Sequence, residues 1–261
     1  MSEIRPVVVG VDGSGVALAA VRVAAGEAVA RGCPLLVVHA VGDGEPPAQA
    51  DRVLARAVGI ASDAAPALEV RTRTAAWSPA VVLAAASREA RLLVVGMAGR
   101  DDPPEAANRS VALDLIRRAH CPLVIVRGSH RRHRGVVLAL LTGSGDADVL
   151  AAGADLAAGH GATLVVERWG AARTGPAEAV VALAHRTRPE VEVSVDDLGA
   201  PVLADLLDHA EGAVALVLAG PAGPARFDDP ARVAVHRGPC PVVVVPRGAP
   251  LDAPLAERWT S

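Results

Sequence analysis

Short apolar runs alternate with helical stretches along the first half of the chain. Apolar residues dominate residues 7–11, 35–40, 92–95 and 123–126, and residues 68–74 alternate as in a strand. Runs without alternation are typical of parallel strands that are covered on both faces. The stretches between them, at residues 16–31, 50–61, 78–90 and 111–119, fit helices. The pattern predicts an α/β fold with a doubly wound parallel sheet and right-handed crossovers.

The order of elements repeats after residue 134. Residues 136–144 parallel 6–14, 161–166 parallel 32–37, 198–201 parallel 76–79, 215–223 parallel 91–99, and 240–247 parallel 121–127. Such a repeat indicates two copies of one domain. We therefore predict two tandem doubly wound parallel-sheet domains of Rossmann-like type, at residues 1–128 and 134–248, followed by a C-terminal tail at 249–261. The segment between the domains is too short to let them move independently.

The last strand of each repeat is apolar throughout, at residues 123–126 and 242–245. An exposed edge of this kind would invite aggregation, so we expect it to be covered by its counterpart in the other repeat. The two strands would then form the seam of an internal pseudo-dimer. Association of two whole chains into a homodimer is left open.

The composition narrows the chemistry. Hydrophobic residues make up 51% of the chain and aromatic residues 2%, so Val, Leu and Ala must build the core. All 26 basic residues are Arg, which excludes a P-loop lysine and Schiff-base mechanisms. The three cysteines have neither a disulfide nor a zinc spacing, and we interpret them as structural.

Partners and location are constrained in the same way. The net charge of −3 gives no general attraction to nucleic acid, and the basic cluster at 130–134 has no interleaved aromatic residues. We interpret that cluster as a solvated linker. The apolar runs are shorter than the roughly 20 residues of a membrane span, and the N-terminus lacks the apolar core of a signal peptide. A cytoplasmic protein with no membrane or nucleic-acid partner is expected.

Residues 91–127 carry the candidate chemistry. A strand ends at Gly96, Gly99 follows after two residues, and Ser110 stands as a candidate N-cap before the helix at 111–119. A helix N-terminus that follows a glycine-bearing loop and a parallel strand is suited to holding phosphate through its free backbone N–H groups. The spacing therefore suggests a nucleotide site.

The motifs resemble those of the universal stress protein family over almost the whole chain, as two tandem domains. Residues 11–14, Val-Asp-Gly-Ser, match the turn that ends the family's first strand. Ser78, Pro79 and Ala80 match a G-x-P-A helix start in which Trp77 replaces the usual Gly. Gly96, Gly99 and Ser110 match the G-x-x-G, nine residues, G-[ST] motif, with Arg109 at the second motif glycine. The fold implied is of the adenine nucleotide alpha hydrolase-like type.

The resemblance implies an ATP site in the N-terminal domain, at the carboxyl ends of the first, second and fourth strands. Asp12 would accept hydrogen bonds from a ribose, the backbone near Ala40 would face adenine, and Gly96, Gly99 and Ser110 would contact ribose and phosphates. Two simpler interpretations remain open. The role of Asp12 could simply be to form an Asx-turn with Ser14, and the role of Ser110 could simply be to cap a helix. Arg109 could either block the phosphate site or pair with phosphate.

The second repeat is expected to bind no ATP. Thr142 replaces the turn aspartate. Counting back from Cys240 places Asp229 at the position of Ser110, so five residues separate it from Gly223 where the first repeat has ten between Gly99 and Ser110. Asp228 and Asp229 would repel phosphate.

Three classes of function follow. We favour a stress-response regulatory protein that binds ATP or a related adenine nucleotide in its N-terminal domain, with at most weak hydrolysis and no catalytic or metal-binding residues. The alternative is an interaction or scaffold protein of the same fold that binds no nucleotide. An enzyme on a related adenine-binding fold ranks third, because the loop signatures of such enzymes are absent. His39 is interpreted as a packed residue, since no nucleophile motif accompanies it.

Overall fold

The computed structural model of this protein describes residues 4–97, 111–127, 135–143, 145–197, 203–221, 223 and 229–247. The first half contains β1 (Val7–Val11), α1 (Gly15–Ala30), β2 (Leu35–Ala40), α2 (Pro47–Ala64), β3 (Val70–Ala75), α3 (Pro79–Ala86), β4 (Leu92–Met97), α5 (Val111–Arg118) and β5 (Leu123–Arg127). The second half contains β6 (Val136–Leu141), α6 (Asp146–His160), β7 (Thr163–Arg168), the 3₁₀ helix η1 (Gly170–Thr174), α7 (Ala177–Thr187), β8 (Val193–Asp197), α8 (Leu203–His209), β9 (Ala215–Ala219), α9 (Pro230–Arg237) and β10 (Val242–Val245).

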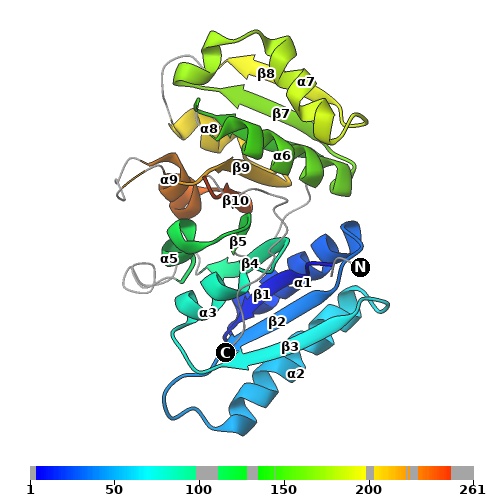
Figure 1. Cartoon of the computed structure of the whole chain (residues 1–261), viewed down its shortest axis with the longest axis vertical. Helices are drawn as coiled ribbons and strands as arrows, with labels where there is room; N and C mark the ends of the chain where they lie inside the picture. The colour runs from blue at the N-terminus through cyan, green and yellow to red at the C-terminus, as the bar shows by residue number, and fades with distance from the viewer. Residues whose placement is uncertain are drawn as a thin grey trace, which may run out of the picture.

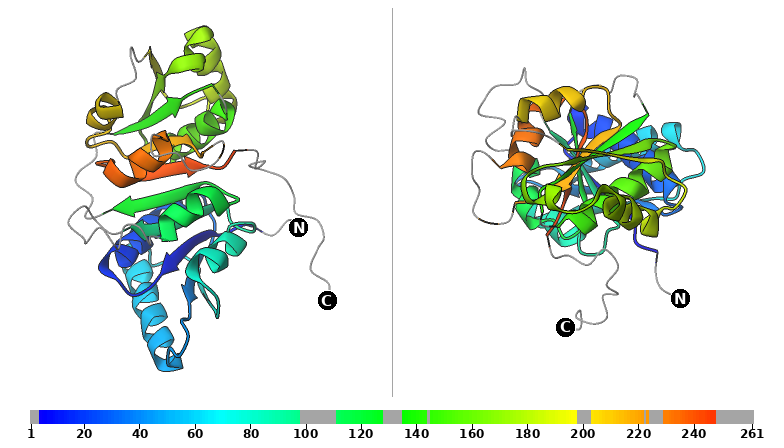
Figure 2. Two further views of the ribbon diagram at one scale, coloured as in Figure 1. Left: turned by 90° about the vertical axis from the view of Figure 1, so that its left-hand side faces the viewer. Right: turned by 90° about the horizontal axis from the view of Figure 1, so that it is seen from above.

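The ten strands form one sheet in the order β3-β2-β1-β4-β5-β10-β9-β6-β7-β8 (Figure 1). Strands within each half are parallel, and the second half has the same order as the first, read from the opposite edge. Seen down the long axis, the strands fan out because the sheet twists (Figure 2). The chain thus has the doubly wound α/β architecture that the hydrophobic pattern predicts.

The halves join where β5 and β10 pair antiparallel, with Val242 opposite Ile125 and Val244 opposite Leu123. These are the two strands that the sequence analysis assigns to the seam. All four of these side chains are at most 1% exposed, so the pairing removes two apolar edges from solvent. The two strands lie side by side at the middle of the molecule in both views (Figures 1 and 2).

Two apolar layers cover the sheet, one on each face. On one face α1, α2, α6 and α7 pack onto the strands, and on the other face α3, α5, α8 and α9 do so. The central strands are therefore buried on both sides, which explains their unbroken apolar runs. The edge strand β3 is different, because Arg71 and Arg73 are exposed on it, as charged residues on sheet edges commonly are.

Two helices differ in length from the sequence prediction. Helix α2 runs from Pro47 to Ala64, longer than the predicted 50–61, because Pro47 fits the first position of a helix. Helix α3 ends at Ala86, four residues before the predicted end at 90. There the buried Ser87 hydroxyl donates to Ala84 O (2.7 Å), a carbonyl oxygen of the last turn. It also accepts the His120 N–H (2.9 Å).

The strand register corrects one part of the repeat alignment. Val8 pairs with Leu93 in the first half, and its counterpart Leu138 pairs with Leu216 in the second. Gly96 therefore corresponds to Ala219, and the alignment of residues 91–99 with 215–223 is wrong by one residue. Matching glycine to glycine would pair Val217 with Leu93, which packs on the other face of the sheet, whereas Val217 shares its face with Val94.

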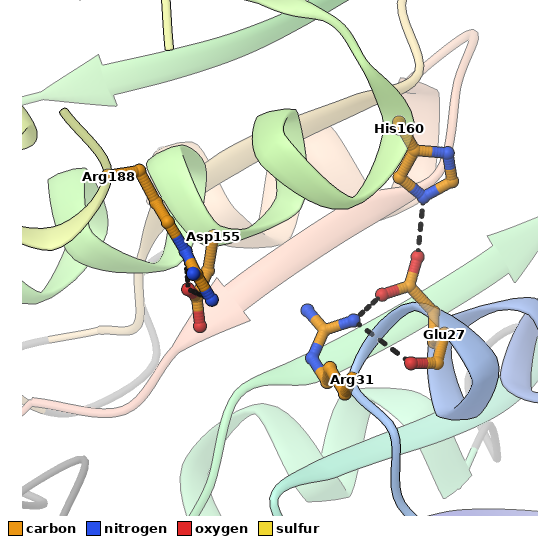
Figure 3. A network of polar contacts seen from close by, with 5 residues as sticks. All are labelled: Glu27, Arg31, Asp155, His160 and Arg188. Carbon is orange, nitrogen blue, oxygen red and sulfur yellow. Dashed lines mark hydrogen bonds and ion pairs between the residues drawn. The ribbon is translucent and has the colours of Figure 1, made fainter. Parts of the chain in front are cut away.

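A polar contact crosses the seam beside the strands (Figure 3). Glu27 on α1 accepts a hydrogen bond from His160 Nε2 on α6 at 2.7 Å, and it also pairs with Arg31 one turn along its own helix. The Glu27 side chain is only 4% exposed. Burial acts to raise its pKa, but the hydrogen bond from His160 and the charge of Arg31 together hold the pKa below the ordinary value.

The lowered pKa makes the contribution of Glu27 to stability depend on pH. A group with a depressed pKa in the folded state stabilises the fold above its unfolded-state pKa, and the contribution is lost as the pH falls through the folded-state value. Glu27→Gln is therefore expected to lower the free energy of unfolding by about 2 kcal/mol at neutral pH. The difference from wild type should shrink below about pH 4. Urea denaturation across this pH range measures both.

Asp155→Asn provides the matched control. Asp155 also pairs with an arginine, Arg188, at 2.7 Å, but the pair lies within one half and both side chains are more exposed (Figure 3). A loss under about 1 kcal/mol is expected for this variant. Equal losses for Glu27→Gln and Asp155→Asn would contradict the view that the buried contact stabilises the seam.

Candidate functional site

Three of the six residues proposed for the site lie in the described part of the chain, and all three lie at the carboxyl ends of neighbouring parallel strands. Asp12 follows β1, Ala40 ends β2, and Gly96 lies in β4. Val11 is paired with His39, and Gly10 is paired with Val95, so β1 runs between the other two strands. Adjacent strands are about 4.8 Å apart, which brings these positions to one edge. Gly99, Arg109 and Ser110 lie outside the described residues.

The turn after β1 is held by the side chain of Asp12. Its Oδ1 accepts the Ser14 N–H at 2.9 Å, which is the Asx-turn weighed as the simpler interpretation. Gly13 has a φ of 84°, which such a turn readily takes only at glycine. Ser14 then caps α1, because its Oγ accepts the Ala17 N–H at 3.3 Å. Among the described residues, Asp12 Oδ2 has no hydrogen-bond partner, so the turn fixes the carboxylate and leaves one oxygen available.

Gly96 allows the first turn of α1 to pack directly against β4. A Cβ at this position would lie 2.6 Å from the carbonyl carbon and oxygen of Val16 and 2.8 Å from Ala17 N. These are backbone atoms of the helix, so a side chain could be accommodated only by moving the helix away from the sheet. The glycine therefore sets the position of the α1 N-terminus, whose partial positive charge attracts anions.

The segment after Ala40 folds back over the end of β2. Glu45 N donates to Gly42 O at 3.1 Å, and Gly44 between them has a φ of 75°. The Glu45 carboxylate secures the turn, since its Oε2 accepts the Gly42 N–H at 3.0 Å. The hydrogen bond from Gly42, with that from His39, lowers the pKa of Glu45.

His39 connects this turn to β1. Its Nδ1 contacts Val11 O at 2.8 Å and its Nε2 contacts Glu45 Oε1 at 2.9 Å. The ring is buried, as the sequence interpretation of a packed residue anticipates. That interpretation missed the two polar contacts, because Glu45 lies in a loop of Gly, Pro and acidic residues that has no periodic pattern.

Trp77 lies in the segment that connects the end of β3 to α3. It follows β3, whose last residue Ala75 is paired with Ala40, and it precedes α3. Its side chain is 74% exposed. The indole that stands where the motif has glycine is therefore exposed, and it follows the strand that pairs with β2.

The corresponding strand ends of the second half are occupied by carboxylates of the chain itself. Asp146 Oδ1 accepts the N–H groups of Thr142 (3.0 Å) and Gly143 (3.1 Å), in the turn equivalent to that of Asp12. Asp229, at the position of Ser110, caps α9 by accepting the N–H groups of Ala231 (2.9 Å) and Arg232 (3.4 Å). Two sets of backbone donors suited to phosphate are thus already satisfied internally.

The end of β7 also carries charge in the second half. Arg168 has the register position of His39, since it pairs with Leu141 as His39 pairs with Val11. Its guanidinium donates to both Asp197 carboxylate oxygens, at 2.7 and 3.0 Å, and to Gly175 O. Next to it, Glu167 accepts from His209 Nδ1 at 2.6 Å, and burial raises the pKa of Glu167.

Two features are absent from the described residues. Within the described ranges, no three His, Cys, Asp or Glu side chains gather closely enough to hold a metal ion. No helix in the described residues is both long and apolar enough to cross a membrane.

Comparison with known proteins extends these observations. Residues 3–127 match the model of the Universal stress protein family. A universal stress protein of Mycobacterium tuberculosis is 31% identical over 131 residues, covering 47% of this chain and 48% of the relative. One of Mycobacterium bovis is 33% identical over 138 residues, covering 46% and 47%. The chain therefore spans about half the length of these curated relatives.

A solved structure covers more of the chain. The crystal structure of a universal stress protein from Archaeoglobus fulgidus superposes on 93% of this chain and 96% of its own, with a TM-score of 0.72 at 16% identity. At this identity the similarity shows the fold alone.

Gly96→Ala tests the close approach of α1 to β4. The substitution is expected to lower the free energy of unfolding by about 1–3 kcal/mol, because the helix backbone must shift. Gly26→Ala is the matched control on α1, since a Cβ there meets nothing within 4 Å and alanine favours the helix by about 0.5–1 kcal/mol. Thermal and urea denaturation of the two variants should give changes of opposite sign. A neutral Gly96→Ala would show that the contact does not constrain the helix.

Proposed function

Because residues 3–127 belong to the universal stress protein family, we propose that this half binds one adenine nucleotide, ATP or a close relative, at the carboxyl ends of β1, β2 and β4. In this proposal the chain consists of two domains, at residues 1–128 and 134–248. The first carries the ligand and the second is structural. The protein acts as a nucleotide-binding regulatory protein of the stress response.

The observation that carries the proposal is the Asp12 turn. The Ser14 N–H holds one carboxylate oxygen at 2.9 Å, and the other oxygen has no partner among the described residues. A carboxylate fixed in this way is an acceptor for ribose hydroxyl groups, and charge-assisted hydrogen bonds of this type are strong. Gly96 keeps the N-terminus of α1 at the same edge of the sheet, where it favours a negatively charged ligand. Ala40 would present its backbone to the base.

Different side chains at the second set of strand ends support a single site per chain. Thr142 supplies a neutral hydroxyl where the first half has Asp12. The Asp146 and Asp229 carboxylates take up backbone N–H groups that a phosphate would need. A phosphate would also meet their negative charge. The second domain is accordingly proposed to stabilise the sheet rather than to bind nucleotide.

In this proposal the protein hydrolyses ATP slowly at most. The alternative is an interaction scaffold that binds no nucleotide, and ATP binding distinguishes the two. Uptake of ATP by the purified full-length chain supports the first, and its absence supports the second. Rapid release of phosphate from ATP would indicate an enzyme and would contradict both.

Asp12 can be tested with two substitutions that separate its roles. Asp12→Ala removes both the turn contact and the ribose acceptor, and it should weaken ATP binding by about 1–3 kcal/mol. Asp12→Asn can keep the Asx-turn through its carbonyl oxygen, but the remaining amide group only donates. It should therefore weaken binding to a similar extent while leaving the melting temperature near that of wild type. Calorimetry and thermal denaturation measure the two effects, and wild-type affinity in Asp12→Asn would restrict Asp12 to a structural role.

The stoichiometry of binding tests the restriction to one half. One ATP per chain is expected for wild type, and Thr142→Ala in the second half should leave the affinity unchanged. The same calorimetric titration gives both quantities. Two equivalents of ATP per chain, or a loss of affinity in Thr142→Ala, would contradict a silent second half.

A further inference from the structure

We propose that Trp77 stacks on the base of the bound nucleotide, an aromatic contact that the family motif, which has glycine at this position, does not supply. The inference rests on the proposed nucleotide site. It adds a binding residue to that site and names the part of the ligand that this residue contacts.

The Trp77 indole is unusually exposed for its type. Its side chain is 74% exposed, and the other exposed large hydrophobic side chains among the described residues are Ile4, Val29 and Val81. Tryptophan in folded proteins is usually buried over most of its surface. Covering this ring with another flat apolar surface would therefore be favourable, because it removes apolar area from water.

The strand before Trp77 is hydrogen-bonded to the strand that ends at the proposed base site. Ala75, the last residue of β3, is paired with Ala40, and its carbonyl oxygen accepts the Val41 N–H at 2.9 Å. Adjacent strands are about 4.8 Å apart, and two further residues of chain span at most about 7 Å. Trp77 therefore lies within two residues of a direct neighbour of Ala40.

The helix after Trp77 holds the same segment from its other end. Because α3 connects two parallel strands, it runs back across the sheet, and its first turn lies at the carboxyl ends of the strands. The helix packs against β1 and β2, and Leu83 lies directly over Gly10, where a Cβ would be only 2.6 Å from Leu83 Cδ1. Asp12 is two residues beyond Gly10 along the chain. The start of α3 is thus at the edge that holds the proposed ribose acceptor.

The paired alanines and α3 share one face of the sheet. Ala40 and Ala75 both pack against the apolar layer that contains Leu83. A base that rests beside Ala40 therefore has the segment between Ala75 and α3 on this side. Residues 76–78 of that segment are Ala, Trp and Ser, so the indole is its large apolar group.

The composition of the chain leaves Trp77 as the aromatic ring available to this site. The chain contains three Trp, one Phe and no Tyr, and Trp77 is the only one of these before residue 135. Trp169 follows β7 in the second half and packs against the apolar core. Stacking on a base from within the first half therefore depends on Trp77.

The experiment measures the dissociation constant for ATP by calorimetry in wild type, Trp77→Ala and Trp77→Phe. Stacking of a base on an aromatic side chain strengthens binding by about five- to a hundredfold, so Trp77→Ala should bind more weakly by a factor in this range. Trp77→Phe keeps an aromatic face and should recover most of the loss. Unchanged affinity in Trp77→Ala, or equal weakening in the two variants, would overturn the proposal.

Val81→Ala provides a matched control on α3. Val81 is 44% exposed and lies one helical turn beyond the segment that contains Trp77. This variant should keep the wild-type affinity for ATP. Since both side chains are exposed, all three variants should also keep the wild-type melting temperature. An equal loss of affinity in Val81→Ala and Trp77→Ala would assign the effect to the helix and contradict the stacking contact.

Quenching of tryptophan fluorescence by acrylamide reports on the ring itself. In the protein without nucleotide the exposed Trp77 should be quenched readily, and ATP should shield it. Trp77→Phe keeps Trp169 and Trp259, and its quenching should not depend on ATP. If wild type takes up ATP without shielding of Trp77, the stacking inference fails while the proposed function stands. If wild type takes up no ATP, both fail.

Discussion

The structure depends on the pairing of two apolar edges. A five-stranded parallel sheet covered by helices on both faces still leaves its last strand open, and in each half that strand has four consecutive apolar residues, at 123–126 and 242–245. Hydrogen bonding β5 to β10 satisfies both edges at once and joins the halves into a single ten-stranded sheet. The outer edges need no such cover, because β3 carries exposed arginines and β8 carries exposed aspartates.

The two halves of this sheet carry different side chains at equivalent strand ends. Val11 and Leu141 both end a strand before a turn that contains a glycine with positive φ, Gly13 and Gly143. The side chains differ, because Asp146 and Asp229 satisfy the turn and helix N–H groups of the second half while Asp12 leaves one oxygen without a described partner in the first. Equivalent strand ends with different side-chain contacts are the physical basis for proposing one ligand per chain. They also explain why the fold alone does not identify the site.

Much of the fold could be predicted from the sequence, because unbroken apolar runs bounded by Gly and Asp mark strands buried on both faces. The bounds of β1 and β2 agree with their predicted ranges, and the seam strands were identified from their composition. The one-residue error in aligning Gly220 with Gly96 arose because sequence matching favours identical residues, whereas register is fixed by which face each side chain occupies. The end of α3 at Ala86 was also missed, because it depends on a hydrogen bond between Ser87 and His120, which is distant in the sequence.

The candidate site was less accessible to sequence reasoning. Asp12 was proposed from the family resemblance and Gly96 from the glycine-bearing loop, but the contact of His39 with Glu45 joins a buried strand to a loop without periodicity. Its only sequence signal is a histidine inside an apolar run, which is also what a packed residue would give. The hydrogen bonds from the turn to Asp146 depend on the direction of a side chain at the start of a helix, which sequence spacing does not determine.

Hydrogen exchange of the full-length protein with and without ATP tests the central claim most directly, because it reports on both sets of strand ends in one sample. The account predicts slower exchange on addition of ATP in the segments around Asp12 and from Ala40 to Glu45, with no change in the segment from Thr142 to Asp146. Protection of the second half, or exchange that is unaffected by ATP throughout the chain, would contradict it.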